Sequence, residues 1–346
     1  MKIVDFRSDT VTWPTSEMRS AMSTAEVGDD VYGEDPSVNR LQEIAAAKLG
    51  KEAGLFVPSG TMGNLIAVLS YCARGDECIM GNLGHTFLFE AGGISALGGV
   101  HPHTLLNQED GTLLLDEIRA AIRPENDHFP HSRLVILENT HNRCGGVPIS
   151  GAYTQQVAEI AHENGLYMHL DGARIFNAAA ALNAPVRSLT DPADSVTFCL
   201  SKGLCAPVGS VICGSREFIR KARRIRKQLG GGMRQAGILA AAGIVALDKM
   251  VDRLGEDHQR AKSLACGLAQ IPGILVDKKS PTSNMVFLSL DKDFGLSAKI
   301  VAAKMAQLGV LVGEIGERQF RLVTHYWIDD QAVGTCIAAF RTVLSA

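Results

Sequence analysis

The sequence predicts a doubly wound α/β protein with a mainly parallel sheet, followed in the chain by a smaller α/β unit. Short apolar runs typical of strands alternate with helical segments from Ser16 to about Met250, as a parallel sheet with helical crossovers requires. A second, shorter set of strand-like and helical runs follows. At 346 residues the chain is long enough to bury a large core and to form two or three domains.

The elements define three segments in chain order. The first fifteen residues, "MKIVDFRSDTVTWPT", contain Pro14 and several hydroxyls but no helical period, so we expect an extended N-terminal arm over 1–15. A large domain is expected over 16–250, with strands in "AGLFVP", "RLVILEN", "LYMHLDGA" and "SVTFCLS" and helices in "TMGNLIAVLSYCA", Leu113–Ile122 and "TQQVAEIAHENG". A small C-terminal α/β domain is expected over 251–346, with strands in "NMVFLSL" and "FRLVTHYW" around a helix at Ser297–Gln307.

Composition is that of an ordinary globular protein and argues against two function classes. Hydrophobic residues make up 46%, charged residues 21%, and the formal net charge is -3, so nucleic acid is not expected as the main partner. The basic run "RKARRIRK" at Arg220–Lys227 has the pattern of a solvated helix face. The apolar runs are too short, or too interrupted by glycine and charge, to span a bilayer, so no membrane segment is expected.

Cysteine and histidine usage indicates neither disulfides nor a metal. The eight cysteines contain no C-x-x-C pair and follow no signal segment, so we expect reduced thiols in a cytoplasmic protein. His101 and His103, in "HPH", are separated by a proline and have no nearby carboxylates in the sequence. We therefore expect a loop at this position and no metal site.

Two predicted strand ends carry polar residues that are suited to chemistry. Ser59, Gly60 and Thr61 open an apolar helix, where free backbone N–H groups and the helix dipole favour a phosphate, although Ser-Gly-Thr is also an ordinary N-cap. Asp171 ends a strand in "MHLDGARIFNA", and Arg174 follows three residues later. This pair fits a capped turn with a paired arginine as well as it fits a functional site.

A third strand end carries Lys202, in "SVTFCLSKGLCAPVGS". By itself it fits a lysine that extends to water, or a desolvated amine that reacts with carbonyls. A phosphate-binding helix start, a strand-end carboxylate and a strand-end lysine, in this order, are together what pyridoxal 5'-phosphate (PLP) needs. The lysine forms a Schiff base, the aspartate keeps the pyridine nitrogen protonated, and the helix start holds the phosphate. The sequence therefore predicts PLP as the cofactor.

Eight separated blocks of the sequence carry a family resemblance: "DFRSDTVT", "AEVGDDVYGEDP", "LFVPSGTMGN", "LENTHN", "HLDGARIFNA", "LSKGLCAPVGS", "GGGMRQAGILAAAG" and "RLVTH". They closely resemble the low-specificity L-threonine aldolases, which are PLP enzymes of the aspartate-aminotransferase fold. The resemblance covers nearly the whole chain in the right order, and its specificity comes from the agreement of all eight blocks. It implies the α/β architecture called PLP fold type I.

The resemblance implies four catalytic residues. Lys202 matches the lysine that binds the cofactor, and Asp171 matches the partner of the pyridine nitrogen. His85, in "NLGHTFLFE", matches the histidine that stacks on the cofactor ring and is a candidate base. His128, in "NDHFP", matches another active-site histidine. On pattern alone, His85 would be a loop or core histidine and His128 a surface-loop histidine.

The resemblance also implies binding residues. Ser8, Arg174 and Arg321 match residues that hold the substrate carboxylate, a task suited to the two-pronged guanidinium group. For Arg321, in "FRLVTH", the alternative is an arginine at the surface edge of a strand. A homotetramer is implied, in which Lys227 and Arg234 resemble phosphate contacts from a neighbouring subunit. The implied cofactor-binding residues are Gly60, Thr61, His85, Asp171, Arg174, Lys202, Lys227 and Arg234.

The implied reaction is the cleavage of L-threonine, L-allo-threonine and related β-hydroxy-α-amino acids to glycine and an aldehyde. The base is His85, or a water held by His85 and His128, and no metal is required. The chain departs from the family pattern at two positions: Phe89 stands where many relatives have a tyrosine, and Cys144 stands where the family does not require a thiol. We expect both differences to affect stereochemical preference more than the reaction itself. Two alternatives stay open: a PLP-dependent β-eliminating lyase that gives ammonia and a keto acid, and a non-catalytic phosphate-binding α/β protein.

Overall fold

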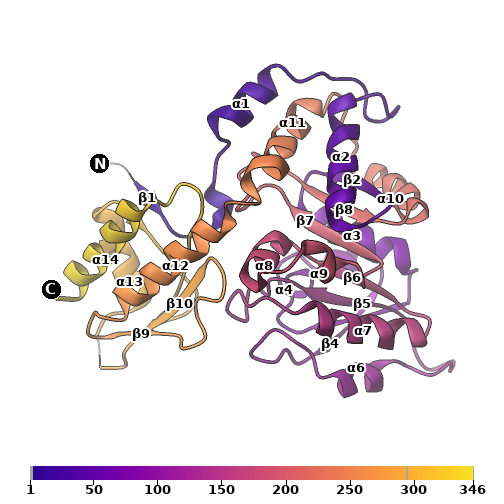
Figure 1. The fold of residues 1–346 in the computed structure, drawn as a ribbon. Coiled ribbons are helices and arrows are strands. Elements are labelled where there is room, and N and C mark those ends of the chain that lie inside the picture. The colour runs from indigo at the N-terminus through magenta and orange to yellow at the C-terminus, as the bar shows by residue number, and fades with distance from the viewer. Residues whose placement is uncertain (1–2, 294, 346) are drawn as a thin grey trace. The chain divides into compact units, whose positions relative to one another are not determined.

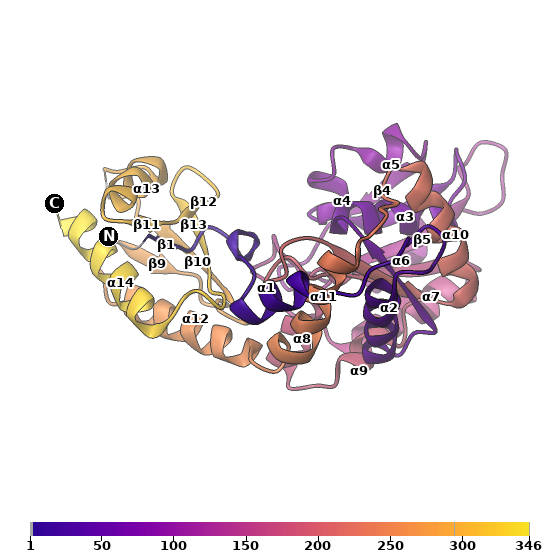
Figure 2. The same ribbon diagram turned by 90° about the horizontal axis from the view of Figure 1, so that it is seen from above.

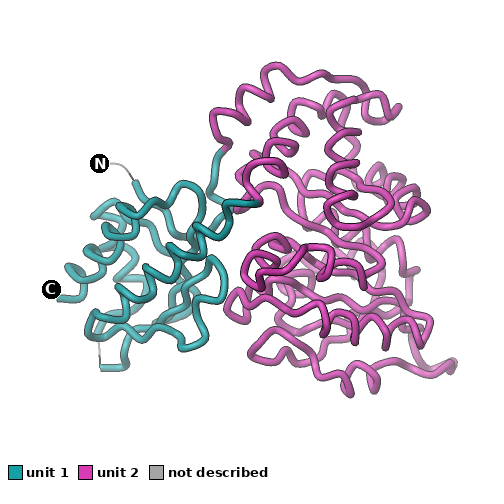
Figure 3. The backbone as a smooth tube through the Cα atoms, in the orientation of Figure 1, with its two compact units in different colours: residues 1–13, 252–346 teal, residues 14–251 magenta. Residues whose placement is uncertain are grey.

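Two compact units make up the computed structural model, which describes residues 3–293 and 295–345. One unit contains residues 14–251, and the other combines residues 1–13 with 252–346 (Figure 3). Met1 and Lys2 of the predicted arm, and Phe294 and Ala346 of the predicted small domain, lie outside the described residues. Among the helices that the structure describes, none has the length and hydropathy needed to cross a membrane.

A seven-stranded sheet forms the centre of the unit 14–251, in the order β2-β8-β7-β6-β5-β3-β4 (Figure 1). Only β8 (Ser210–Gly214) runs antiparallel to its neighbours in this sheet, so the other strands end at one common edge. The sheet is therefore mainly parallel, as the sequence predicts. The other strands are β2 (Ala53–Val57), β3 (Glu77–Gly81), β4 (His101–Leu105), β5 (Ser132–Glu138), β6 (Tyr167–Asp171) and β7 (Ser195–Cys199).

Helices cover both faces of this sheet. Figure 2 shows α3 (Gly60–Tyr71) and α10 (Arg216–Gln228) on one side and α2 (Pro36–Leu49) and α9 (Val186–Thr190) on the other. Apolar side chains of β2, β8, α3 and α10 form one buried cluster, which fixes α3 against the sheet. The remaining helices of the unit are α1 (Ser16–Ser23), α4 (His85–Leu88), α5 (Gly93–Ala96), α6 (Leu115–Ala121), α7 (Gly151–Glu163), α8 (Ile175–Leu182), α11 (Gly237–Val245) and the π-helix η2 (Ala246–Met250).

One expectation for this unit is wrong, because "HPH" is not a loop. His101–Leu105 forms β4, the edge strand that pairs in parallel with β3. An edge strand needs ladder hydrogen bonds on one side only, so it tolerates Pro102. A carboxylate is also close by in space: Glu77 Oε1 lies 3.0 Å from His103 Nδ1, and Arg123 Nε donates to Glu77 Oε2 at 2.9 Å. The fold supplies this neighbour from the adjacent strand.

The other unit contains the N-terminal arm together with the C-terminal elements. Strand β1 (Val4–Asp5) pairs in parallel with β11 (Val310–Leu311), and Phe6 is fully buried in the core of this unit. Trp13 stacks on Trp327 with ring centroids 4.4 Å apart. The C-terminal residues therefore bind the arm. The remaining elements are η1 (Asp9–Val11), α12 (Leu254–Leu268), α13 (Ala298–Gln307), α14 (Asp330–Ser345) and the antiparallel strands β12 (Gly313–Glu314), β13 (Gln319–Val323), β10 (Met285–Leu290) and β9 (Ile274–Val276).

Candidate active site

Three of the predicted site residues follow strands that end at the same edge of the large sheet. Asp171 is the last residue of β6, Lys202 follows the end of β7, and Gly60 begins α3 just after β2. Because β2, β6 and β7 point the same way, these residues lie at their common carboxyl edge. A Cβ added at Gly60 would lie 3.0 Å from Cys199 Sγ, so the start of α3 lies directly beside the end of β7.

The start of α3 has the properties of an anion site. Ser59 is the N-cap, and its hydroxyl accepts a hydrogen bond from the Met62 N–H at 3.2 Å. Gly60 and Thr61 occupy the first two helical positions, where backbone N–H groups have no partner inside the helix. The missing side chain at Gly60 leaves the backbone accessible. These N–H groups and the helix dipole favour a phosphate.

Asp171 is held as a buried acceptor. It is 3% exposed, its Oδ2 accepts from Asn64 Nδ2 at 2.9 Å, and its Oδ1 accepts from the Ala173 N–H at 3.2 Å. Asn64 lies one helical turn beyond Gly60 in α3 and is itself buried. The carboxylate is therefore oriented by two donors, which suits it to pair with a protonated ring nitrogen.

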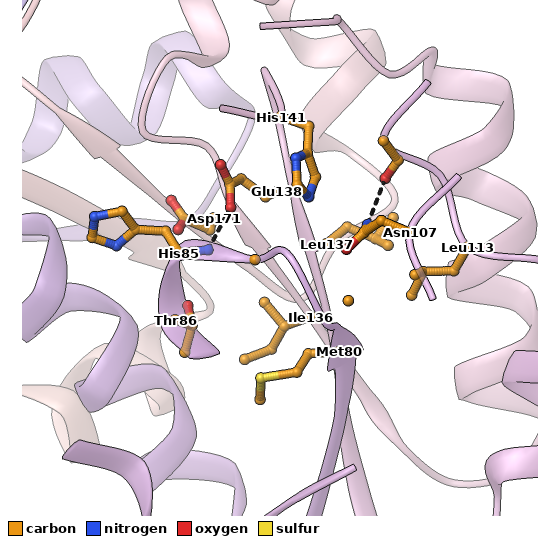
Figure 4. A pocket seen from close by; sticks show the side chains of 13 residues that line it. Met80, His85, Thr86, Asn107, Leu113, Ile136, Leu137, Glu138, His141 and Asp171 are labelled. Atoms are coloured by element: carbon orange, nitrogen blue, oxygen red, sulfur yellow. Dashed lines mark hydrogen bonds between the residues drawn. The ribbon is translucent and has the colours of Figure 1, made fainter. Parts of the chain in front are cut away.

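His85 lies beyond the end of β3, and both its backbone and its ring contact a glutamate. Its backbone N–H donates to Glu138 Oε2 at 2.7 Å (Figure 4). Its ring Nδ1 lies 2.9 Å from Glu90 Oε1. One ring nitrogen of His85 and one carboxylate oxygen each of Glu90 and Asp171 lie within 4.8 Å of one another. The hydrogen bond to Glu90 raises the pKa of His85 more than burial lowers it, and the Asp171 charge adds to the rise while the Lys202 charge opposes it. His85, Asp171 and Lys202 thus share one electrostatic environment.

A small cavity lies beside His85 and has polar and apolar walls (Figure 4). It encloses about 10 Å³, roughly the space that one water needs, and is too small for an amino acid. His141 Nδ1 is buried, with no hydrogen-bond partner among the residues that the structure describes. The lining side chains include Met80, Asn107, Ile136, Glu138, His141 and Asp171.

The predicted carboxylate-binding residues are divided between the two units. Ser8 is the N-cap of η1, where its hydroxyl accepts from the Thr10 N–H at 3.2 Å. Arg321 lies in β13, and its Nη2 donates to the Arg7 carbonyl at 3.3 Å, so the structure brings Arg321 next to the arm residue that precedes Ser8. Arg174 belongs to the unit 14–251, where it precedes α8 and is 7% exposed.

The remaining predicted residues are exposed. His128 precedes β5 and so lies toward the amino end of that strand, whereas His85 follows the carboxyl end of β3, which is parallel to β5. One chain therefore does not bring the two histidines together. Lys227 is in the last turn of α10, and Arg234 Nη1 pairs with Asp29 Oδ2 at 2.9 Å.

Three residues of the site are absent from the sequence-based assignment: Asn64, Glu90 and Glu138. Each had a signal in the sequence. Asn64 is a polar residue in an apolar helix, and Glu90 is a charged residue next to the apolar "FLF". Glu138 ends β5 just as Asp171 ends β6, and their register pairs them directly. Buried polar residues of this kind need partners, so they mark a site even without a motif.

Comparison with known proteins gives consistent matches. The beta-eliminating lyase family matches residues 5–291. The chain is 50% identical to low-specificity L-threonine aldolase 1 of Arabidopsis thaliana over 347 residues, which cover 99% of this chain and 97% of that protein. It is 44% identical to the low specificity L-threonine aldolase of Escherichia coli K12 over 343 residues, which cover 99% of this chain and 100% of that protein. The structure of Leishmania major threonine aldolase matches with a TM-score of 0.82 at 20% identity, over 99% of each chain. At this identity the match supports the fold alone.

The mainly parallel sheet, with the polar residues at its carboxyl edge, is the PLP fold type I architecture that the sequence predicts. The chain belongs to the beta-eliminating lyase family and is similar along its whole length to the low-specificity L-threonine aldolases.

Proposed function

We propose that the protein is a PLP-dependent lyase that cleaves L-threonine, L-allo-threonine and related β-hydroxy-α-amino acids to glycine and an aldehyde. The observation that carries the proposal is the common position of Asp171, Lys202 and the start of α3 at one sheet edge. Full-length identity of 44–50% to proteins named as low-specificity L-threonine aldolases supports the substrate class.

The residues at this edge fit PLP by their chemistry. Lys202 would hold the cofactor covalently, and Asp171, oriented by Asn64 and Ala173, would pair with the pyridine nitrogen. Gly60 and Thr61 would hold the phosphate at the start of α3, where a side chain at Gly60 would crowd Cys199. When bound, PLP supplies an electron sink for the negative charge that develops at the substrate Cα.

The protein side chains have two further tasks. Arg174, Arg321 and Ser8 bind the substrate carboxylate, which orients the Cα–Cβ bond for cleavage. A base, either His85 or a water that it holds, takes the β-hydroxyl proton. The Cα–Cβ bond then breaks, the aldehyde leaves, and a proton added at Cα gives glycine. His85 is suited to proton transfer at Nε2, because its Nδ1 is bound to Glu90.

β-Elimination is a second candidate, because the matching family is described as beta-eliminating lyase. It would use the same cofactor and carboxylate-binding residues but break the bond from Cβ to its oxygen, and would release ammonia and a keto acid. The names of the full-length relatives favour cleavage to glycine.

A homotetramer remains part of the proposal. His128 is exposed at the other end of the strands from His85, so it would act in the site of a second copy of the chain. Lys227 and the Asp29-paired Arg234 are exposed and would reach a neighbour's phosphate in the same way. The cytoplasmic location stays a prediction from the sequence.

The visible absorption spectrum and the variant Lys202→Ala test the proposal together. We expect a yellow protein that loses its colour on borohydride reduction, and a Lys202→Ala variant that is folded but has no covalently bound cofactor and no turnover. Lys299→Ala, which removes an exposed lysine of α13, is the matched control and should keep colour and activity. Substantial threonine cleavage by Lys202→Ala would overturn the assignment of the lysine.

A further inference from the structure

Glu90 contacts His85 directly and is linked to Asp171 through Asn64, yet neither the family match nor the reaction assigns it a role. Its side chain is 2% exposed. Its Oε1 lies 2.9 Å from His85 Nδ1 and 2.9 Å from Asn64 Nδ2. Asn64 Nδ2 also donates to Asp171 Oδ2 at 2.9 Å. Glu90 is thus linked directly to His85 and, through a single amide nitrogen, to Asp171.

The direction of each hydrogen bond in this network is determined by its chemistry. Asn64 Nδ2 carries two hydrogens, and both point to carboxylate oxygens, so the Asn64 carbonyl must accept from His169 Nε2, which is 3.2 Å away. Burial lowers the pKa of His169 to about 4, so this ring is neutral at pH 7. Because the Asn64 oxygen can only accept, the one proton of the ring is on Nε2. His169 Nδ1 then accepts from the Ser195 hydroxyl at 2.8 Å. A flipped Asn64 would turn its oxygen toward two carboxylates.

The fixed network constrains His85. Glu90 accepts from Asn64 and offers a carboxylate oxygen to His85 Nδ1, so the favourable arrangement has a proton on Nδ1. The other ring nitrogen, Nε2, is then the only one available for proton exchange. The charged groups around the ring are Glu90, Asp171 from β6, Lys202 after β7, and Glu138 from β5, which binds the His85 backbone N–H.

We propose that Glu90 is a positioning residue, which holds His85 through Nδ1 and Asp171 through Asn64, and so limits proton exchange by His85 to Nε2. This role in catalysis rests on the proposed function, whereas the hydrogen bonds themselves do not. Glu90 consequently has the largest single influence on the pH at which His85 accepts a proton, because its carboxylate lies 2.9 Å from Nδ1.

Nitrogen-15 spectra of the histidine rings, recorded by solid-state NMR across pH on the full-length protein as purified, test the proposal. His85→Asn identifies the His85 signals. In the wild type, neutral His85 should have its proton on Nδ1. Glu90→Gln keeps the shape and removes the charge, and should lower the titration midpoint of His85 by about 1 pH unit or more. A proton on Nε2 in the neutral wild-type ring, or an unmoved midpoint in Glu90→Gln, would overturn the proposal.

A matched control is available in the same sheet. Glu77 is another buried carboxylate, 3.0 Å from His103 Nδ1, so Glu77→Gln changes a carboxylate–histidine contact elsewhere in the sheet and should leave the midpoint of His85 in place. Movement of the His85 midpoint in Glu77→Gln would show an unspecific effect and count against the proposal. If Glu90→Gln does not fold, the wild-type spectrum still tests the proposal, because it shows which ring nitrogen of neutral His85 carries the proton.

The pH dependence of kcat/KM connects the contact to catalysis. In Glu90→Gln the acidic limb should move to lower pH by as much as the His85 midpoint, whereas partial unfolding would lower the whole profile without moving it. If the His85 midpoint moves in Glu90→Gln but the acidic limb of the kcat/KM profile does not, the positioning role is refuted. Absence of threonine cleavage in the wild type, with the expected His85 spectra, would instead refute the proposed function and leave the contact intact.

Discussion

Replacement of Gly63 by alanine tests how tightly α3 must pack for the proposed phosphate site to form. Gly63 is buried in the first turn of α3, against β7. An added Cβ would lie 2.6 Å from Thr197 Cγ2 and 3.0 Å from Thr197 Oγ1. Carbon atoms that are not bonded stay about 3.5–4.0 Å apart, so the start of the helix must move by roughly 1 Å.

The size of the effect follows from two opposing contributions. Overpacking of a buried contact costs about 1–3 kcal/mol, and Thr197 is fully buried, so it has no room to yield. Alanine in a helix is better than glycine by roughly 0.5–1 kcal/mol, which offsets part of that cost. We expect Gly63→Ala to lower the free energy of unfolding by about 1–2 kcal/mol. The displaced helix start should also weaken PLP binding.

Urea unfolding and a fluorescence titration of PLP measure both effects. Gly334→Ala in α14 is the matched control: among the described residues beyond its chain neighbours and the backbone of its own helical turns, no atom lies within 4 Å of its added Cβ, so it should stabilise the protein by roughly 0.5–1 kcal/mol. Thr197→Ser removes the Cγ2 that clashes, so Gly63→Ala should cost less in that background. A Gly63→Ala variant as stable as wild type, with unchanged PLP affinity, would show that the contact does not set the position of α3.

Four further variants each test a single residue. His85→Asn should weaken PLP binding and lower kcat at saturating PLP by about 10²–10⁴ if His85 is the base, whereas His128→Asn should lower kcat alone; a silent His128→Asn would remove that residue from the reaction. Arg321→Lys should raise KM for threonine strongly, since an ammonium group cannot make the two-pronged carboxylate contact, and an unchanged KM would place carboxylate binding elsewhere. Burial alone would raise the pKa of Glu77, but hydrogen bonds, chiefly from Arg123 and His103, outweigh burial and lower it. The ionised form therefore stabilises the fold above the unfolded-state pKa of about 4.3, and Glu77→Gln should destabilise at pH 7 but progressively less as the pH falls below that value; a difference independent of pH would contradict this reasoning.

Much of the fold could be predicted from the sequence, because its strands and helices have clear local patterns. The apolar run around Leu55 and the helix after Ser59 are both present, with Ser59 as the N-cap. The strand that ends at Asp171 and the strand before Lys202 are also present. The loop expected at Pro102 is wrong, because a strand's position at the sheet edge, where proline is tolerated, depends on the order of strands and not on local sequence.

The candidate site, like the fold, could be predicted from the sequence only in part. Asp171, Lys202 and the start of α3 could be found because residues at the ends of parallel strands meet at one edge. Asn64 and Glu90 stand out in the sequence as polar residues in apolar surroundings, but their shared partners could not be predicted: Asn64 reaches Asp171, 107 residues away, and Glu90, 26 residues away, only through the packing of α3 on the sheet. For His128 the sequence predicts more than one chain provides. The family resemblance assigns His128 to the site, whereas the fold of one chain does not bring it to His85.

Product analysis tests the proposed reaction most directly. The purified protein is incubated with PLP and L-threonine, and glycine, acetaldehyde, ammonia and the keto acid are quantified over time, with Lys202→Ala as the inactive control. Cleavage of the Cα–Cβ bond gives glycine and acetaldehyde in equal amounts and no ammonia, and this is the result we expect. Ammonia and a keto acid in place of glycine would contradict the proposed cleavage and assign the site to β-elimination.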